Sequence, residues 1–206
     1  MRIAVISEVS ARDKNPFILE ALRETDAEVF NVGMANGMPP PELTYIHTGL
    51  MAALALETGA ADFVVGGCGT GLGFLLSVMQ YPKVFCGLII DPVDAWLFSQ
   101  INGGNCISLA LNKGFGWAAD INLKYIFEKL FCDEAGRGYP PHRSKSQQES
   151  RKLLENISTT THREFASILK EIDKSTLETV QGHKVFTDFI GNYGSNGEVR
   201  DIILNK

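Results

Sequence analysis

The chain has 206 residues, of which 45% are hydrophobic and 21% charged, and its formal net charge is -5. This length and composition suit one globular domain with a substantial core and a smaller appendage. The negative charge and the absence of a Lys/Arg stripe argue against nucleic acid as a partner. No apolar run is long enough to span a membrane, so we expect no membrane partner either.

The four cysteines are Cys68, Cys86, Cys106 and Cys132, and no two of them form a C-x-x-C pair. Wide spacing of this kind favours reduced thiols over a disulfide framework or a zinc site, so we expect no bound metal. The first predicted strand starts directly after Met1, which leaves no space for a signal peptide. We therefore expect a cytoplasmic protein.

Short apolar runs alternate with amphipathic stretches up to about residue 131. The apolar runs predict strands at 2–7, 27–32, 63–65, 84–90 and 106–111. The stretches between them predict helices that begin at Asn15-Pro16, at 43–57, at 72–79, at Asp91-Pro92 and at 114–131. This alternation predicts an α/β fold: a Rossmann-like five-stranded parallel sheet with helices on both faces.

The composition changes near Asp133, where a polar segment with two adjacent prolines begins. Two amphipathic helices are predicted at 147–157 and 164–172, and from Gln181 the sequence has no clear periodicity. We therefore divide the chain into an α/β domain, residues 1–154, and a C-terminal helical extension, residues 155–206.

A glycine-rich turn follows the third predicted strand, in the order Gly67-Cys68-Gly69-Thr70-Gly71-Leu72-Gly73-Phe74. A strand, a glycine turn and a helix start direct free backbone N–H groups and the helix dipole at an anion. A cysteine in such a corner is favoured as a thiolate, which is a usable base or nucleophile. The alternative is that the glycines only permit a close crossing and Cys68 is a small buried residue. The spacing of the glycines differs from that of the G-x-G-x-x-G motif and from that of a nucleotide-hydrolase phosphate loop.

The stretch Cys68-Gly69-Thr70-Gly71-Leu72-Gly73 resembles the turn of the B-type ribose-5-phosphate isomerases and of the subunits of galactose-6-phosphate isomerase. A second, weaker match is Asn102-Gly103-Gly104-Asn105, which lies at the family's distance from the first. The resemblance covers roughly residues 1–155.

The resemblance implies an aldose–ketose isomerase that acts on a pentose or hexose phosphate through a cis-enediolate. The thiolate of Cys68 would be the base and the Thr70 hydroxyl would support it. The oxyanion would be held by backbone N–H groups, which are those of Gly69, Gly71, Leu72 and Gly73. No cofactor or metal is implied.

The resemblance also implies positions that bind the substrate. Glu8 keeps a carboxylate for sugar hydroxyls and Asn102 occupies the second motif. The family's arginine after the fifth strand falls near Asn112, with Lys113 adjacent as a substitute charge. Phosphate ligands from a neighbouring subunit would come from the end of the α/β domain, where Arg137, Arg143 and Arg151 are the candidates.

Several family positions differ, and two of the differences each remove a histidine. Val9 stands where the family has a histidine, and Ile101 replaces the histidine that opens the sugar ring. Isoleucine neither donates nor accepts a proton, so the resemblance implies proton transfer without ring opening. His47, on the helix before the glycine turn, is more plausible as an ordinary helix residue than as a substitute for the ring-opening histidine. Asp91 is more plausible as the N-cap of the helix that Pro92 begins than as a ligand-binding residue.

The family's site lies between two subunits, so we expect a homodimer or a dimer of dimers with shared sites. The segment Tyr139 to Arg151 would reach across, and the apolar face of Phe165, Ile168 and Leu169 would add contact area. A non-catalytic partner subunit of the same fold is the alternative function, and a dinucleotide-binding redox domain is disfavoured by the absence of G-x-G-x-x-G.

Overall fold

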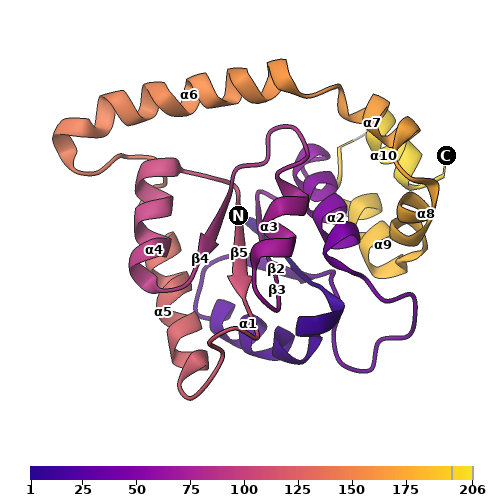
Figure 1. The fold of residues 1–206 in the computed structure, drawn as a ribbon, viewed down its shortest axis with the longest axis horizontal. Coiled ribbons are helices and arrows are strands. Elements are labelled where there is room, and N and C mark those ends of the chain that lie inside the picture. Colours follow the sequence, from indigo (N-terminus) through magenta and orange to yellow (C-terminus); the bar gives the residue numbers. More distant parts are fainter. Residues whose placement is uncertain (196, 206) are drawn as a thin grey trace.

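The protein is described by a computed structural model that covers residues 1–195 and 197–205. Five parallel strands form one sheet in the order β2-β1-β3-β5-β4, with helices on both faces (Figure 1). The strands are β1 (Arg2–Ser7), β2 (Glu28–Asn31), β3 (Phe63–Cys68), β4 (Cys86–Ile89) and β5 (Cys106–Ala110). The α/β class and the parallel sheet predicted from the sequence are confirmed.

The helices of the sheet domain follow the predicted order. They are α1 (Asn15–Leu22), α2 (Tyr45–Glu57), α3 (Leu72–Val78), α4 (Pro92–Leu97) and α5 (Ala119–Phe131), with a 3-10 helix η1 (Val9–Lys14) and a π-helical turn η2 (Phe98–Asn102). Asp91 caps α4 as predicted, because its Oδ1 accepts the N–H groups of Val93 at 2.8 Å and Asp94 at 2.9 Å.

Alternate residues of each strand enter two separate cores, as the two-residue period of a strand requires. Ala4, Ile6 and Val64 face a core shared with α2 and α3. Ile3, Val5 and Val65 face the opposite core, which α1, α4 and α5 complete. The central strands are therefore buried on both faces and carry their polar groups at their carboxyl ends.

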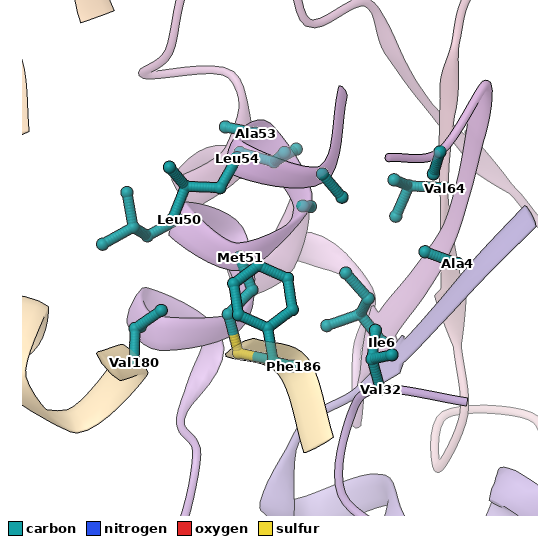
Figure 2. Packing of buried hydrophobic residues seen from close by; sticks show 14 of the residues in the cluster. Ala4, Ile6, Val32, Leu50, Met51, Ala53, Leu54, Val64, Val180 and Phe186 are labelled. Atoms are coloured by element: carbon teal, nitrogen blue, oxygen red, sulfur yellow. The ribbon is translucent and has the colours of Figure 1, made fainter. Parts of the chain in front are cut away.

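In the C-terminal part of the chain, all of the regular structure of the described residues is helical. It consists of η3 (Pro141–Arg143), α6 (Ser144–Thr161), α7 (Phe165–Glu171), α8 (Lys174–Gly182), α9 (Lys184–Tyr193) and α10 (Glu198–Ile203). Helices α7 to α10 pack beside α2, and Figure 2 places Val180 and Phe186 against Leu50 and Met51. Helix α2 is consequently buried between the sheet and the C-terminal helices.

Several sequence-based expectations need correction. The turn at the third strand is shorter than predicted, because Gly67 and Cys68 belong to β3 and Gly73 to α3. The helix predicted from residue 114 begins only at Ala119, because Gly114 and Ala118 have positive φ angles of 77° and 63°. The tail after Gln181 is not patternless, since it forms the end of α8 and the helices α9 and α10.

The apolar face of α7 has a different role from the one predicted. Phe165 and Leu169 are each 2% exposed and join the core of their own chain, with Ile168 partly buried beside them. That face is therefore not available to a second subunit.

Helix α6 is an exposed element of the fold and spans the molecule from α4 to α7 (Figure 1). Of its 18 residues only Ser158 is buried, and its hydroxyl accepts the N–H of Lys83 at 2.9 Å. Leu153, Leu154 and Ile157 are exposed by 60%, 50% and 47%. The predicted boundary between residues 154 and 155 falls inside this helix.

Candidate active site

Cys68 is the last residue of β3 and lies at the carboxyl edge of the sheet. It is 6% exposed and belongs to the core that faces α2. All four cysteines are free thiols in the structure. In parallel sheets ligands bind beyond the carboxyl ends of the strands, so the thiol is at the expected place for chemistry.

The turn after Cys68 presents backbone donors. The N–H of Gly71 donates to the Cys68 carbonyl at 3.2 Å, and the N–H of Leu72 donates to Thr70 Oγ1 at 3.3 Å. Within the described part of the chain, the N–H groups of Gly69, Thr70 and Gly73 donate to no protein acceptor. Gly71 makes this turn with a φ angle of 75°, a conformation that glycine adopts without strain. The turn can therefore offer several N–H groups to a developing oxyanion.

Thr70 and Tyr45 both lie near the end of β3 that carries the thiol. Cys68 Sγ is 3.9 Å from Thr70 Oγ1, within hydrogen-bonding distance for sulfur. A β-carbon at Gly73 would lie 3.5 Å from Cys68 Sγ and 3.0 Å from the Cγ of Tyr45, which begins α2. The thiol thus lies within reach of a hydroxyl, and the space at Gly73 separates it from an aromatic ring.

Glu8 follows β1 and brings a carboxylate to the same edge. The residue is 4% exposed, and Ser10 Oγ donates a hydrogen bond to its Oε1. No buried side-chain oxygen in the described ranges lacks a partner. The other carboxylate oxygen of Glu8 accepts no hydrogen bond from the described residues. Because every fully buried oxygen in those ranges has a partner, this oxygen must be in contact with solvent.

The loop after β5 joins this cluster. The backbone N–H groups of Asn112 and Lys113 both donate to the Gly69 carbonyl, at 2.9 and 2.8 Å. The Asn112 side-chain amide donates to the Ser10 carbonyl at 2.8 Å. Lys113 is exposed, and its backbone is bonded to the glycine turn. The structure therefore brings together Glu8, Cys68, Thr70, the glycine turn and Lys113.

Asn102, Arg137 and Arg143 lie elsewhere in the same chain. Cys68 pairs with Ala110 at the end of β5, whereas Asn102 precedes the start of β5. The four residue steps from Cys106 to Ala110 correspond to about 13 Å. Asn102 therefore lies near the opposite edge of the sheet from Cys68.

Arg137 lies beside η2, the element that contains Asn102, and Arg143 follows in the next helical turn. The backbone N–H groups of Gly136 and Gly138, on either side of Arg137, donate to the Ser99 and Gln100 carbonyls in η2, each at 2.8 Å. Arg137 Nη1 is 3.9 Å from Asp133 Oδ1, and Arg143 ends η3 on the surface. Arg151 Nη1 donates to the Gly136 carbonyl at 2.9 Å and packs against Gly103. These residues form a second cluster within one chain.

His47 caps the start of α2. Its Nδ1 accepts the N–H of Thr44 at 3.0 Å, which completes a capping box. Burial lowers the pKa of His47, and the carboxylate of Asp173 partly opposes that shift. A neutral imidazole is the form that accepts the Thr44 N–H, so this histidine acts in helix capping.

Two residues of the cluster were not predicted from the sequence, namely Ser10 and Tyr45. Ser10 lies in a 3-10 helix and Tyr45 begins α2, and neither belongs to a motif. Only the packing of η1 and α2 against the glycine turn brings Ser10 to Gly69 and Tyr45 to Gly73. In the described ranges no group of three His, Cys, Asp or Glu side chains is arranged to hold a metal ion, and no helix has the length and apolar character to cross a membrane.

A model of a known protein family matches most of the sheet domain. The family model described as Ribose/Galactose Isomerase matches residues 3–134. The chain belongs to the ribose/galactose isomerase family, as its glycine turn predicted. A comparison with curated proteins finds no match.

Two similar solved structures extend over the whole chain. One is 4-deoxy-L-threo-5-hexosulose-uronate ketol-isomerase complexed with a tartrate, with 42% identity, a TM-score of 0.95 and coverage of 100% of both chains. The other is a ribose-5-phosphate isomerase from Vibrio parahaemolyticus, with 40% identity, a TM-score of 0.94 and coverage of 100% of this chain and 98% of that one.

A third structure is more distant. A ribose 5-phosphate isomerase from Thermotoga maritima shares 20% identity over 72% of this chain and 97% of its own, with a TM-score of 0.55, and supports the fold alone.

Proposed function

We propose that this protein is a cofactor-independent aldose–ketose isomerase in which Cys68 is the base. The thiolate would take the proton from C2 of an open-chain aldose, and the C–H electron pair would form the C1–C2 double bond of a cis-enediolate. The carbonyl electron pair moves onto O1, and the resulting oxyanion accepts hydrogen bonds from the N–H groups of the turn. The thiol then returns the proton to C1, and the hydroxyl proton passes from O2 to O1.

The observation that carries this proposal is that Cys68 directly precedes a turn in which, among the described residues, the N–H groups of Gly69, Thr70 and Gly73 have no protein acceptor. A base and an oxyanion site within one turn are the two requirements of proton transfer next to a carbonyl. The Thr70 hydroxyl, 3.9 Å from the sulfur, would support the thiolate. Glu8 would accept hydrogen bonds from sugar hydroxyls through its solvent-facing oxygen.

We propose an open-chain keto-uronate, the class named in the ketol-isomerase relative, as the substrate. A 4-deoxy-5-hexosulose uronate has no hydroxyl on C4 and a carbonyl at C5. Its aldehyde therefore cannot close a five- or six-membered ring through these positions. Such a substrate needs no ring opening, which agrees with Ile101 at the position where the family places its ring-opening histidine.

Ribose 5-phosphate is the second candidate, because the relative from Vibrio parahaemolyticus bears that name at 40% identity. Lys113, Arg137 and Arg143 supply the cations that a phosphate requires. The sugar phosphate substrate predicted from the sequence thus stays a prediction, and a direct comparison of the two substrates decides between them.

We further propose that the site is shared in a homodimer, or in a dimer of dimers. Asn102, Arg137 and Arg143 lie away from Cys68 within one chain, so they would serve the site of a second subunit. The exposed apolar residues Leu153 and Leu154 on α6 are suited to burial against that subunit. Asn102 would bind the sugar chain, and the arginines would bind its anionic end.

The test is turnover in deuterated water with 4-deoxy-L-threo-5-hexosulose uronate and with ribose 5-phosphate. We expect faster conversion of the uronate, with solvent deuterium entering the carbon that receives the proton. Cys68→Ser should lower kcat by about 10²- to 10⁴-fold, while Cys132→Ser at an exposed thiol should not. Equal rates for Cys68→Ser and the unsubstituted protein would exclude the cysteine base. No turnover of either substrate would favour the non-catalytic partner subunit.

A further inference from the structure

The Glu8 carboxylate is held by a single protein hydrogen bond in the described part of the chain. That bond comes from the hydroxyl of Ser10, two residues further on in η1. Glu8 itself is 4% exposed, and its second carboxylate oxygen accepts no protein hydrogen bond in that part of the chain. A buried carboxylate with one donor depends strongly on that donor for its position.

Ser10 is in turn fixed from two sides. Its carbonyl accepts the Asn112 side-chain amide at 2.8 Å, and the following Ala11 N–H donates to the Glu8 carbonyl at 3.1 Å. The preceding Val9 N–H donates to the Leu43 carbonyl at 2.8 Å, just before α2. The backbone around Ser10 is therefore tied to β1, to the loop after β5 and to the segment before α2.

Gly69 leaves the space in which this contact is made. A β-carbon at Gly69 would lie 3.1 Å from Asn112 Nδ2 and 3.4 Å from Ser10 Oγ. The Ser10 hydroxyl consequently lies between the Glu8 carboxylate and the first residue of the oxyanion turn. A displacement of the Ser10 hydroxyl would therefore shift the Glu8 carboxylate relative to the turn that binds the reacting oxygen.

We propose that Ser10 is a positioning residue of the active site. Its hydroxyl orients the Glu8 carboxylate so that the second oxygen accepts substrate hydroxyls, and Asn112 fixes Ser10 for this task. The proposal rests on the proposed function, because it assigns substrate hydroxyls to Glu8. Ser10 acts through Glu8, so its loss should weaken substrate binding while proton transfer by Cys68 continues.

Kinetics and ligand binding together test this role. With the hexosulose uronate, Ser10→Ala should raise KM about tenfold, the usual cost of one hydrogen bond to a charged group, and leave kcat within about threefold. The dissociation constant of tartrate, measured by calorimetry, should rise by a similar factor. Ser10→Thr keeps the hydroxyl and should restore both values.

A double-variant cycle separates positioning from simple packing. In a Glu8→Ala background Ser10→Ala should have almost no further effect, because the residue acts only through that side chain. Ser175→Ala is the matched control, since Ser175 Oγ donates to Asp173 Oδ2 two residues away, at 2.6 Å, on the remote helix α8. This control should leave KM and tartrate binding unchanged.

The outcomes distinguish the two proposals. Additive effects in the double variant, or a Ser10→Ala protein with unchanged KM and tartrate affinity, would overturn the role of Ser10 alone. Tartrate binding without turnover would refute the isomerase and leave the role of Ser10 to be decided by the tartrate affinities. An unsubstituted protein that neither turns over the uronate nor binds tartrate would overturn both.

Discussion

Tyr45 lies against Gly73 where the start of α2 meets the first turn of α3, and a β-carbon at position 73 would be 3.0 Å from the tyrosine Cγ. This contact is tighter than ordinary van der Waals packing, so a methyl group there must displace the ring or the turn. Cys68 Sγ would be 3.5 Å from the same β-carbon. Gly73 therefore sets the space between the thiol and the aromatic ring.

We predict that Gly73→Ala lowers kcat/KM by about tenfold to a hundredfold, because small displacements of reacting groups are costly. Steady-state kinetics with the uronate measure the change. Gly182→Ala is the control, since a β-carbon there would meet nothing within 4 Å. Unchanged kinetics in Gly73→Ala would mean that this contact does not position the thiol.

The four thiols should react in a defined order with iodoacetamide. Burial and, after it, the carboxylate of Asp133 raise the pKa of Cys132 despite its exposed position. Burial also raises the pKa of Cys106. We predict that Cys68 is alkylated first near neutral pH and that Cys132 gains on it as the pH rises, as peptide mapping would reveal. Faster labelling of Cys132 at pH 7 would contradict the assignment of Cys68 as the activated thiol.

Restoring a ring-opening group should broaden the range of substrates. Ile101 is half-buried at the end of η2, on the same element as Asn102. We predict that Ile101→His speeds turnover of ribose 5-phosphate, by up to about a hundredfold, and leaves the open-chain uronate unaffected. High activity of the unsubstituted protein on ribose 5-phosphate, unaffected by His47→Ala, would place the ring-opening group elsewhere.

The exposed stripe of α6 should control assembly. Charges at Leu153 and Leu154 would be buried in the proposed dimer at a high cost in free energy. We predict that Leu153→Glu with Leu154→Glu yields monomers at micromolar concentration by sedimentation and abolishes turnover. Val185→Glu on α9, exposed by 46%, is the control and should leave the dimer intact. A monomeric unsubstituted protein with full activity would refute the shared site.

The free energy of unfolding should decrease as the pH is lowered through the range where histidine titrates. Burial lowers the pKa of both His47 and His183 below the ordinary value of 6.5. The unfolded chain then binds more protons than the folded one, so the stability contributed by the neutral histidines is complete above about pH 6.5 and is lost as the pH falls through the lowered values.

We predict that the urea midpoint decreases between pH 7 and pH 5, and that the decrease is smaller in His47→Gln with His183→Gln. His142→Gln, at an exposed position, is the control and should retain the full decrease. The same slope in all three proteins would assign the effect to other groups.

Much of the fold could be predicted from local pattern. The limits of β1 and the start of α1 agree with the structure, since a strand buried on both faces is a continuous apolar run and Pro16 marks a first helical turn. Cys68 and its glycine turn were also predictable, because the turn is contiguous in the chain. The helix after β5 was predicted too early, because its start depends on positive φ angles in the preceding loop.

Only the tertiary structure decided which distant residues meet. Ser10 and Tyr45 lie beside Gly69 and Gly73 because η1 and α2 pack against the end of β3, and nothing in their local sequence indicates this. The placement of β5 between β3 and β4 puts Asn112 beside Gly69, whereas Asn102 lies about a strand length away. The amphipathic pattern of α7 showed that Phe165 and Leu169 would be buried but not against which surface. The free energy gained by burying an apolar side chain depends on the area buried and not on which apolar surface covers it. The surface that α7 packs against is therefore decided by the packing of the whole chain.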